Sequence, residues 1–479
     1  MENLSSLSRF APELWIMAGI LFAFLGSLSK KLSGGPLIFV LLAITAAVGQ
    51  LGNEPTSLFE GLIAVDGFTH LFRLFFLIVG ALTIVMSAYS KELEKQGSEF
   101  SALVLTVVLG MMLMGSARNL LMAYLAMEMV SIISYALVAS LKGNLRSREA
   151  GIKYIIFGGL ASGAMLLGMS FLYGMTGSLD FGAIAATMAL KSPNTVTLFI
   201  SVVLILAGLG FKVSAAPFHM WAPDVYEGAP IAVTAFLSVG PKAAGFALLL
   251  RLFHSTNLAA GELSLIWPGL IAAISVATMF IGNLTALWQD NLKRLMAFSS
   301  VAHAGYLLMA VVLMNTAGMT AIVFYLFAYL LMNFGAFMVI SVVADQAGTE
   351  DIRAMRGLWK RNPWLAIMMG VFLFSLTGLP PAFGFIGKFY LFAALIESGW
   401  IWLAIVGLLN SVISLAYYMR IAKVMLIDGT EGEMILPEGR MVAPAVTTTV
   451  VTVLAGLTLL FGIYWEPIRV FAESTFGMI

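Results

Sequence analysis

The chain contains no cysteine and little histidine, and both absences remove whole classes of function. Without cysteine there can be no disulfide, iron–sulfur cluster or thiolate metal site. The net charge of +1 gives no reason to expect nucleic acid as a partner, and no glycine-rich nucleotide fingerprint follows a strand pattern. The four histidines are scattered, which argues against a metal centre or a b-type haem: His70, His219, His254 and His303.

Charged residues are also scarce. They make up 11% of the 479 residues, whereas a soluble protein carries roughly a quarter. Hydrophobic residues make up 60%, and the mean hydropathy is +0.98. The apolar runs are about 20 residues long, which suits transmembrane helices and is twice the length of a barrel strand. The fold class predicted is therefore an all-α polytopic membrane protein. The N-terminus has no basic n-region, so we expect its first apolar run to be a retained span.

Fourteen spans are predicted from the apolar runs. None of the connecting loops is long enough to form a soluble catalytic domain. The predicted spans cover residues 11–29, 36–51, 67–89, 101–117, 119–141, 150–173, 195–226, 231–253, 264–286, 293–313, 318–344, 362–398, 400–427 and 443–464.

Two of these spans are too long for ordinary helices. At 1.5 Å per residue, 195–226 and 362–398 would reach roughly 48 and 55 Å, against a hydrocarbon core of about 30 Å. Each contains breakers: Pro217 in the first, and Thr377-Gly378-Leu379-Pro380-Pro381 in the second. Interrupted helices in corresponding positions indicate repeated halves, which an odd number of spans makes inverted. The alternative is two proline kinks without symmetry.

This symmetry divides the chain into four predicted segments. The N-terminal helices occupy 1–100, the first repeat 101–253, the second repeat 264–428, and a C-terminal helix 443–479. Loops that follow odd-numbered spans hold 16 of the 21 lysines and arginines outside the spans, and the positive-inside rule therefore places these loops in the cytoplasm and both termini on the other side. Arg73, Arg251 and Glu397 lie near the outer ends of spans, where we expect interfacial anchors.

Ionisable residues inside apolar spans are costly and mark functional sites in membrane proteins. Glu128, Lys212, Lys242 and Lys388 lie at similar depth on four different spans. Three lysines cannot all be paired with one glutamate, so some are expected to be neutral part of the time and able to exchange protons. The alternative is that these residues only hold helices together, or have carboxylate partners that the sequence does not reveal.

Other polar residues carry weaker signals. Lys153 could extend to the membrane surface, and Lys293 begins a span, where a surface lysine is expected. His219 and His303 could relay protons, or could simply be hydrogen-bonded within a helix bundle. Asp224 and Glu227 are expected to cap a helix or to face cytoplasmic water.

Four stretches resemble the antiporter-like membrane subunits of respiratory complex I and of multisubunit cation/proton antiporters. They are SREAGIKYIIFGGLASG, GLGFKVSAAPFHMWAPDVYEGAP, NLTALWQDNLKRLMAFSSVAHAGYLL and GLPPAFGFIGKFYLF. The resemblance implies about 14 helices with two inverted five-helix repeats, each containing a broken helix. It matches Glu128 and Lys212 to the paired residues of a first half-channel, Lys242 to a bridging lysine and Lys388 to a second half-channel. It also matches Lys153, His219, Lys293 and His303 to polar positions of a central axis.

Three features resemble the N-type branch of this family: a lysine at position 388, a chain that ends soon after span fourteen, and the continuation DVYEGAP. This branch implies a proton-translocating subunit of an NADH–quinone oxidoreductase in a bacterial inner membrane. The chain itself would hold no cofactor, because NADH, FMN, the iron–sulfur clusters and quinone bind to partner subunits. Its partners would be other antiporter-like and small membrane subunits. Two alternatives stay open: a subunit of a cation/proton antiporter, and a structural scaffold whose lysines carry no protons.

Overall fold

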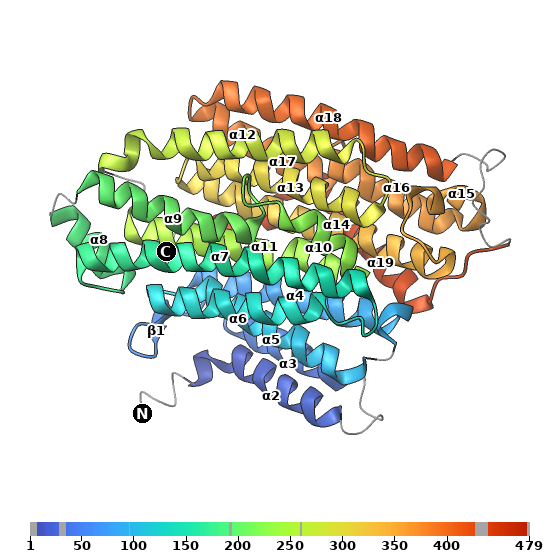
Figure 1. Ribbon diagram of the computed structural model, residues 1–479, viewed down its shortest axis with the longest axis horizontal. Coiled ribbons are helices and arrows are strands. Elements are labelled where there is room, and N and C mark those ends of the chain that lie inside the picture. Colours follow the sequence, from blue (N-terminus) through green and yellow to red (C-terminus); the bar gives the residue numbers. More distant parts are fainter. Residues whose placement is uncertain are drawn as a thin grey trace.

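The computed structural model describes residues 7–27, 35–94, 96–190, 194–258, 261–426 and 439–476. Helices running alongside one another make up most of it (Figure 1). Each predicted span coincides with a helix or with a broken pair of helices, which confirms the fold class. The ends of two predicted spans, 28–29 and 427, lie outside the described residues, as do 1–6 and 477–479.

The long elements are α2 (Ala11–Gly26), α3 (Gly35–Gly49), α4 (Gly67–Ala88), α5 (Gly97–Ser116), α6 (Leu120–Val138), α7 (Leu145–Thr176), α9 (Thr195–Val213) with α10 (Trp221–Gly228), α11 (Ile231–Thr256), α12 (Trp267–Ala286), α13 (Leu292–Val311), α14 (Thr316–Ala347), α16 (Pro363–Thr377) with α17 (Phe383–Glu397), α18 (Ile401–Leu426) and α19 (Ala445–Ile463). Within the described ranges, eleven helices are long and apolar enough to cross a membrane.

Asparagine caps six of the described long helices. Its side-chain oxygen accepts a backbone N–H that the first turn of a helix leaves unpaired, which matters most where no water can replace it. These caps fix where each span begins: Asn119 for α6, Asn144 for α7, Asn194 for α9, Asn291 for α13, Asn315 for α14 and Asn362 for α16.

Both predicted helix breaks are present. The first separates α9 from α10, because Ser214 adopts a left-handed conformation (φ 60°) and ends α9 before Pro217. The second separates α16 from α17, where Gly378 (φ 87°) ends α16 before Pro380. Breaking a helix inside a membrane exposes backbone carbonyls, which must then find partners within the protein. The two breaks therefore create the polar interior around which the site is built.

Short elements that the sequence did not predict mark the two ends of the bundle. A hairpin of β1 (Thr56–Leu58) and β2 (Ile63–Val65) lies at the same end as α8 (Phe181–Leu190), and we call this the hairpin end. The opposite end carries α15 (Leu358–Arg361) and is called the α15 end (Figure 1). The 3₁₀ turns η1 (Lys91–Leu93), η2 (Gly261–Leu265) and η3 (Ile352–Met355) join spans. Helix α20 (Glu466–Phe476) packs against α4 and α14.

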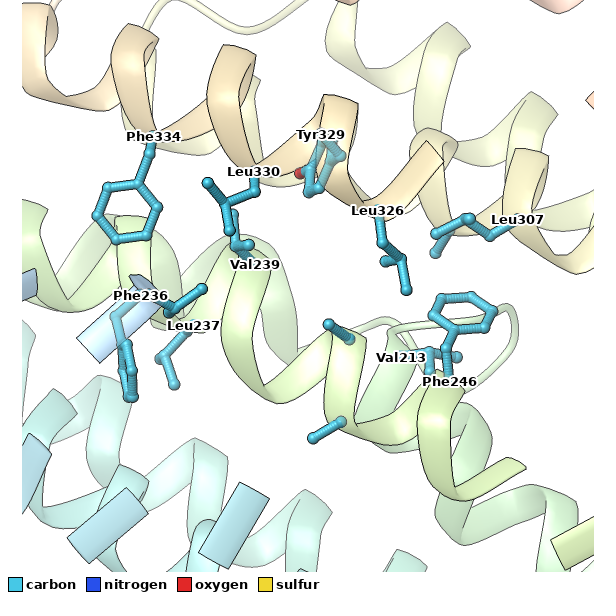
Figure 2. Close-up of a cluster of buried hydrophobic side chains, with 14 of the residues drawn as sticks. Val213, Phe236, Leu237, Val239, Phe246, Leu307, Leu326, Tyr329, Leu330 and Phe334 are labelled. Carbon is cyan, nitrogen blue, oxygen red and sulfur yellow. The ribbon is translucent and has the colours of Figure 1, made fainter. Parts of the chain in front are cut away.

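Helices α11, α13 and α14 form the centre of the molecule and are buried on nearly every side. Lipid is as apolar as a leucine side chain, so close packing and polar contacts hold membrane helices together. One polar contact is the hydrogen bond from Asn333 Nδ2 of α14 to Ser238 Oγ of α11, at 2.6 Å. Figure 2 shows the apolar seam, with α11 contributing Phe236, Leu237, Val239 and Phe246, and α14 contributing Leu326, Tyr329, Leu330 and Phe334.

One backbone pairing occurs twice, at opposite ends of the bundle. Asn119 at the start of α6 forms a bridge with Asp180, and Asn291 at the start of α13 forms a bridge with Asp351. In each case a helix start is paired with the segment that follows the next long helix along the chain. The register is also the same, because Glu128 and Ser300 each lie nine residues after the capping asparagine. Helices α6 and α13 therefore begin in the same way but at opposite ends of the bundle.

Candidate functional site

Lys212 lies in the last turn of α9, just before the first helix break, and is buried (2% exposed). Its Nζ donates a hydrogen bond to Ser131 Oγ of α6 at 3.0 Å. The Lys212 stem packs beside Gly245 of α11, where an added Cβ would lie 3.2 Å from Lys212 Cγ. No carboxylate among the described residues lies within 4.0 Å of the ammonium, so a hydroxyl is its hydrogen-bond partner.

Glu128 lies one turn before Ser131 on α6, and its carboxylate interacts electrostatically with Lys212. Within the described residues the two form no direct ion pair, and Glu128 Oε1 is buried without a hydrogen-bond partner. Residues three apart on a helix share a face, so Glu128 and Ser131 lie on the same side of α6. A small displacement of α6 would therefore change how strongly Glu128 attracts the Lys212 charge.

Lys242 lies near the middle of α11 and is 4% exposed. Its Nζ donates to Ser300 Oγ of α13 and lies 5.8 Å from the centre of the Tyr226 ring. An aromatic face attracts a cation without carrying a charge. Like Lys212, Lys242 is bound by neutral groups among the residues that the structure describes.

His303 follows one turn after Ser300 on α13 and is enclosed by tyrosines. Its Nδ1 lies 2.6 Å from the Tyr325 hydroxyl, and its Nε2 lies 3.1 Å from the Tyr418 hydroxyl. Tyr418 also hydrogen-bonds to Ser299 Oγ. A hydroxyl can both donate and accept, so this connected group can pass a proton without moving the backbone.

Lys388 lies in α17, just after the second break, and is 3% exposed. Its Nζ donates to three acceptors: Leu376 O at 3.2 Å, Thr377 O at 2.7 Å and Ser411 Oγ at 2.8 Å. The two carbonyls form the C-terminal end of α16, where the helix dipole attracts a positive charge. The Tyr306 ring of α13 lies 4.7 Å from Nζ.

Gly378 is required where Lys388 approaches the end of α16. Its φ of +87° is one that other L-residues rarely adopt. An added Cβ there would lie 2.7 Å from Lys388 Cδ. The glycine thus ends the helix and leaves room for the lysine to reach the freed carbonyls.

Helix α13 connects these positions. Ser300, His303 and Tyr306 follow one another at helical spacing along one face. Ser300 meets Lys242, His303 meets the two tyrosines, and Tyr306 faces Lys388. The structure thus brings Lys242, His303 and Lys388 into one row of polar groups. Lys212 lies beside α11 at Gly245, three residues after Lys242.

The predicted relay residues at the α15 end lie in two clusters. Lys153 is 39% exposed at its side chain and pairs with Asp224 (2.7 Å) and Glu149 (2.8 Å). Arg294 binds Asp224 and Glu227, so these acids are engaged in ion pairs as well as lying near the surface.

Lys293 is buried, 3% exposed, and pairs with Glu350 at 2.8 Å, so the expectation of a surface lysine is wrong. The reason is that η3 and its preceding loop fold over the start of α13. His219 lies in the first break, 8% exposed, and its Nδ1 has no hydrogen-bond partner in the described part of the chain.

Arg73 and Arg251 were expected to be interfacial anchors, but both are buried. Arg73 is fully buried and pairs with Glu13 at 2.6 Å, while Arg251 donates two bonds of 2.8 Å to Asp66. Burial opposes ionisation of Asp66, but the Arg251 guanidinium outweighs it and lowers the Asp66 pKa to about 2. Both pairs join residues far apart in sequence. Glu397, by contrast, is exposed as expected.

Sequence reasoning missed the hydroxyl partners of the buried lysines, Ser131, Ser300 and Ser411, and those of His303, Tyr325 and Tyr418. The first two carry a usable signal, since Ser131 follows Glu128 by one turn and Ser300 precedes His303 by one turn. Ser411, Tyr325 and Tyr418 lie on other helices than the groups they bind, and no local spacing connects them to a charged residue. Within the described residues, no group of three or more metal-ligating side chains occurs.

Comparison with known proteins defines the class. Residues 117–414 match the family described as NADH:quinone oxidoreductase/Mrp antiporter, transmembrane. The fold is similar to a chain of respiratory complex I from Thermus thermophilus with bound aureothin, at a TM-score of 0.80 and 32% identity over 96% of this chain and 98% of that chain. It is also similar to a chain of the Mrp complex from Dietzia sp., at a TM-score of 0.85 but 20% identity over 98% and 96%, which shows the fold alone.

The branch follows from closer relatives. NADH-quinone oxidoreductase subunit N 2 of Sorangium cellulosum is 45% identical over 100% of this chain and 99% of its own length. Subunit N of Anaeromyxobacter sp. is 42% identical over 99% and 97%. The chain belongs to the NADH-quinone oxidoreductase subunit N family, within the larger antiporter-like family.

Proposed function

We propose that the chain is a proton-translocating membrane subunit of a complex I-type NADH–quinone oxidoreductase, and that Glu128, Lys212, Lys242 and Lys388 carry the protons. One observation supports this most strongly. The three lysines are each at least 96% buried, yet hydroxyls, carbonyls and aromatic rings are their near partners among the described residues. A lysine that is buried without a fixed counter-ion can exist in both protonation states, which a permanent ion pair would prevent.

The proposed steps use the contacts described above. The Glu128 carboxylate helps to hold the proton of Lys212, so a displacement of Glu128 releases that proton toward Lys242. Protonation of Lys242 places a second positive charge in the row and favours release onward through Ser300, His303 and Tyr418. The proton then reaches Lys388, where the α16 carbonyls hold the ammonium. Water along the two helix breaks completes the path, and Lys153, His219 and Lys293 connect it to the α15 end.

Energy for this movement comes from partner subunits. The resemblance to complex I assigns NADH, FMN, iron–sulfur clusters and quinone to those partners, and the chain supplies proton transfer. Enzyme activity therefore belongs to the assembled NADH:quinone oxidoreductase. The alternative of a cation/proton antiporter subunit is less well supported, because identity to the chain of the Mrp complex is 20%, whereas identity to the subunit N relatives reaches 45%.

The membrane arrangement is part of the proposal. The repeated bridge at the starts of α6 and α13 supports inverted repeats at 101–253 and 264–428, flanked by 1–100 and 443–479. We place the α15 end in the cytoplasm and both termini in the periplasm of a bacterial inner membrane.

Cysteine labelling tests this orientation cleanly because the chain has no native cysteine. Lys360→Cys lies exposed at the α15 end, and Leu265→Cys, 92% exposed in η2, lies at the other end. An impermeant reagent added to intact cells should label position 265 and spare position 360. The reverse pattern would overturn the orientation.

Removal of Lys212 or Lys388 tests the function. Lys212→Ala and Lys388→Ala should each lower NADH-driven acidification of membrane vesicles by roughly tenfold or more, because each removes a proton-transfer group. Acidification is normalised to assembled complex. Lys212→Ala should assemble less well, because it leaves the Glu128 charge uncompensated. Normal pumping by both variants would favour a purely structural scaffold.

A further inference from the structure

A cavity of about 240 Å³ opens at the α15 end, beside the start of α11 and the end of α14. Three carboxylates line it, each from a different segment: Glu92 from η1, Asp345 from α14, and Glu350 from the loop before η3. Asp345 is engaged by Lys91, whose backbone N–H and Nζ contact its Oδ2 and carbonyl oxygen. Glu92 and Glu350 remain as the two groups that connect the cavity to the interior.

Glu350 connects the cavity to Lys293. The carboxylate is 24% exposed at its side chain, and its Oε1 lies 2.8 Å from the Lys293 ammonium, which is 3% exposed. The same ammonium donates to Ala229 O at 3.0 Å. Lys293 is therefore a buried cation with one side turned to a carboxylate that faces the cavity.

Glu92 also interacts electrostatically with Lys293. Its Oε2 accepts the backbone N–H of Ile231, the first residue of α11, at 2.9 Å, so it caps the helix that carries Lys242. The charged groups that act on it are Lys293, Glu350 and Asp345. Burial raises the pKa of Glu92, and the attraction of Lys293 opposes this rise. Glu92 thus holds a proton at higher pH than a free glutamate does.

The repeated bridge provides an internal comparison. Lys293 lies two residues after the capping Asn291, and Glu350 lies just before Asp351. The corresponding residues at the hairpin end are Leu121, two residues after Asn119, and Leu179, just before Asp180. The same backbone arrangement thus carries a buried ion pair at the α15 end and two leucines at the hairpin end. The backbone pairing does not need these charges, which points to a role beyond folding.

Helix α13 leads inward from this ion pair. Ser300 lies two turns after Lys293 on the same face, roughly 10 Å along the axis, and binds Lys242. A proton that leaves Lys293 along this face therefore arrives at the central lysine.

We propose that Glu92 and Glu350 form a proton-loading site at the α15 end, which takes protons from water and delivers them through Lys293 to Lys242. The carboxylate of Glu92 accepts a proton from hydronium and leaves water. Lys293 releases its own proton inward, toward Ser300 and Lys242. The neutral amine of Lys293 then takes the proton held by the adjacent carboxylic acids, which restores both charges for the next cycle. This inference rests on the proposed function and names the entrance to its proton path.

The test uses Glu92→Gln in the complete complex. Glutamine keeps an oxygen that can accept the Ile231 N–H, so the α11 cap survives while the proton-binding group is lost. Glu94→Gln, an exposed change in the same linker, is the matched control. NADH-driven acidification of vesicles is measured from pH 6 to pH 8.5, and oxidation of NADH by a soluble acceptor verifies the redox subunits.

We expect Glu92→Gln to pump several-fold more slowly than the wild type at pH 8.5 and to approach it at pH 6, where hydronium is abundant. Glu94→Gln should match the wild type throughout. Wild-type pumping by Glu92→Gln at every pH would overturn the inference, as would a defect confined to Glu92→Ala, which would show that the cap alone matters. Lys388→Ala, assayed in parallel, distinguishes failure of this inference from failure of the proposed function. If Lys388→Ala pumps normally, the proposed function itself fails.

Discussion

Lys212 and Lys388 lie beside corresponding helix breaks but are held in different ways. Lys212 precedes its break and binds the Ser131 hydroxyl, with the charge of Glu128 nearby. Lys388 follows its break and binds two carbonyls at the end of α16 together with Ser411. The first lysine thus interacts with the charge of a side chain on another helix, while the second is held by backbone dipoles at a helix end.

Because of this difference, the sites of Lys212 and Lys388 are suited to different roles. A carboxylate on a separate helix can be displaced, so the first half is suited to receive a signal from neighbouring subunits. A helix end has a fixed partial charge, so the second half is suited to hold a proton until the path opens. Within the described residues, neither lysine is locked in an ion pair of 4.0 Å or less.

We expect the largest effect from Gly378→Ala, which changes the helix break beside Lys388. The added Cβ would meet Lys388 Cδ. The alanine would also have to keep the positive φ of Gly378, at a cost of roughly 1–2 kcal/mol in backbone energy alone. We expect pumping to fall by about tenfold or more, comparable to the loss of a proton-transfer group.

The matched change at the first break is Ser214→Gly, which relieves a positive φ and should leave pumping near wild type. Vesicle acidification compares the two variants at equal complex content. Equal pumping by both would show that the room beside Lys388 does not matter.

Glu128→Gln should have the next largest effect. It removes the movable charge of the first half and keeps the side-chain volume, and we expect pumping to fall several-fold. Combined with Lys212→Ala, it should add little, because two residues that act as one unit are not additive. A double variant that loses the full product of the single effects would show that Glu128 and Lys212 act independently.

The hydroxyl partners give a smaller, paired test. Ser131→Ala removes the described hydrogen-bond partner of Lys212, whereas Ser411→Ala leaves Lys388 with two carbonyl acceptors. A hydrogen bond to a charged group contributes roughly 1.5–3 kcal/mol. We therefore expect Ser131→Ala to slow pumping a few-fold and Ser411→Ala to change it little. Pumping rates at saturating NADH decide the order, and the reverse order would contradict the comparison.

The smallest effect on pumping should come from the ion pair between Asp66 and Arg251, which lies outside the row. The pKa of Asp66 falls from 3.8 to about 2, so its stabilising contribution is complete above pH 4 and is lost as the pH falls toward 2. This contribution is about 2 kcal/mol. Thermal unfolding of the purified chain in detergent should show an acid-induced loss between pH 4 and 2 that Asp66→Asn lacks. The same decrease in unfolding temperature with falling pH in the wild type and in Asp66→Asn would contradict this prediction.

The spans and both breaks were predictable from the sequence because apolar length and proline position are local signals. The burial of Arg73 and Arg251 was not, since their partners lie 60 and 185 residues away and a charge near a helix end usually marks the interface. The prediction of a surface position for Lys293 was wrong for a similar reason, because its partner Glu350 lies beyond α14 in the sequence. Helices α8 and α20 and the hairpin are too short or too polar to produce a transmembrane signal.

Lys388 also has a consequence for the number of hydrogen bonds in each cycle. A charged ammonium has three N–H donors, and the structure provides it with three acceptors: Leu376 O, Thr377 O and Ser411 Oγ. A neutral amine has only two donors, so each departing proton leaves one acceptor unoccupied. Ser411 also donates to Thr377 O at 2.9 Å, so Thr377 O keeps a partner when it loses the hydrogen bond from Lys388. Under the proposed function, every turnover therefore breaks and re-forms one hydrogen bond at the end of α16.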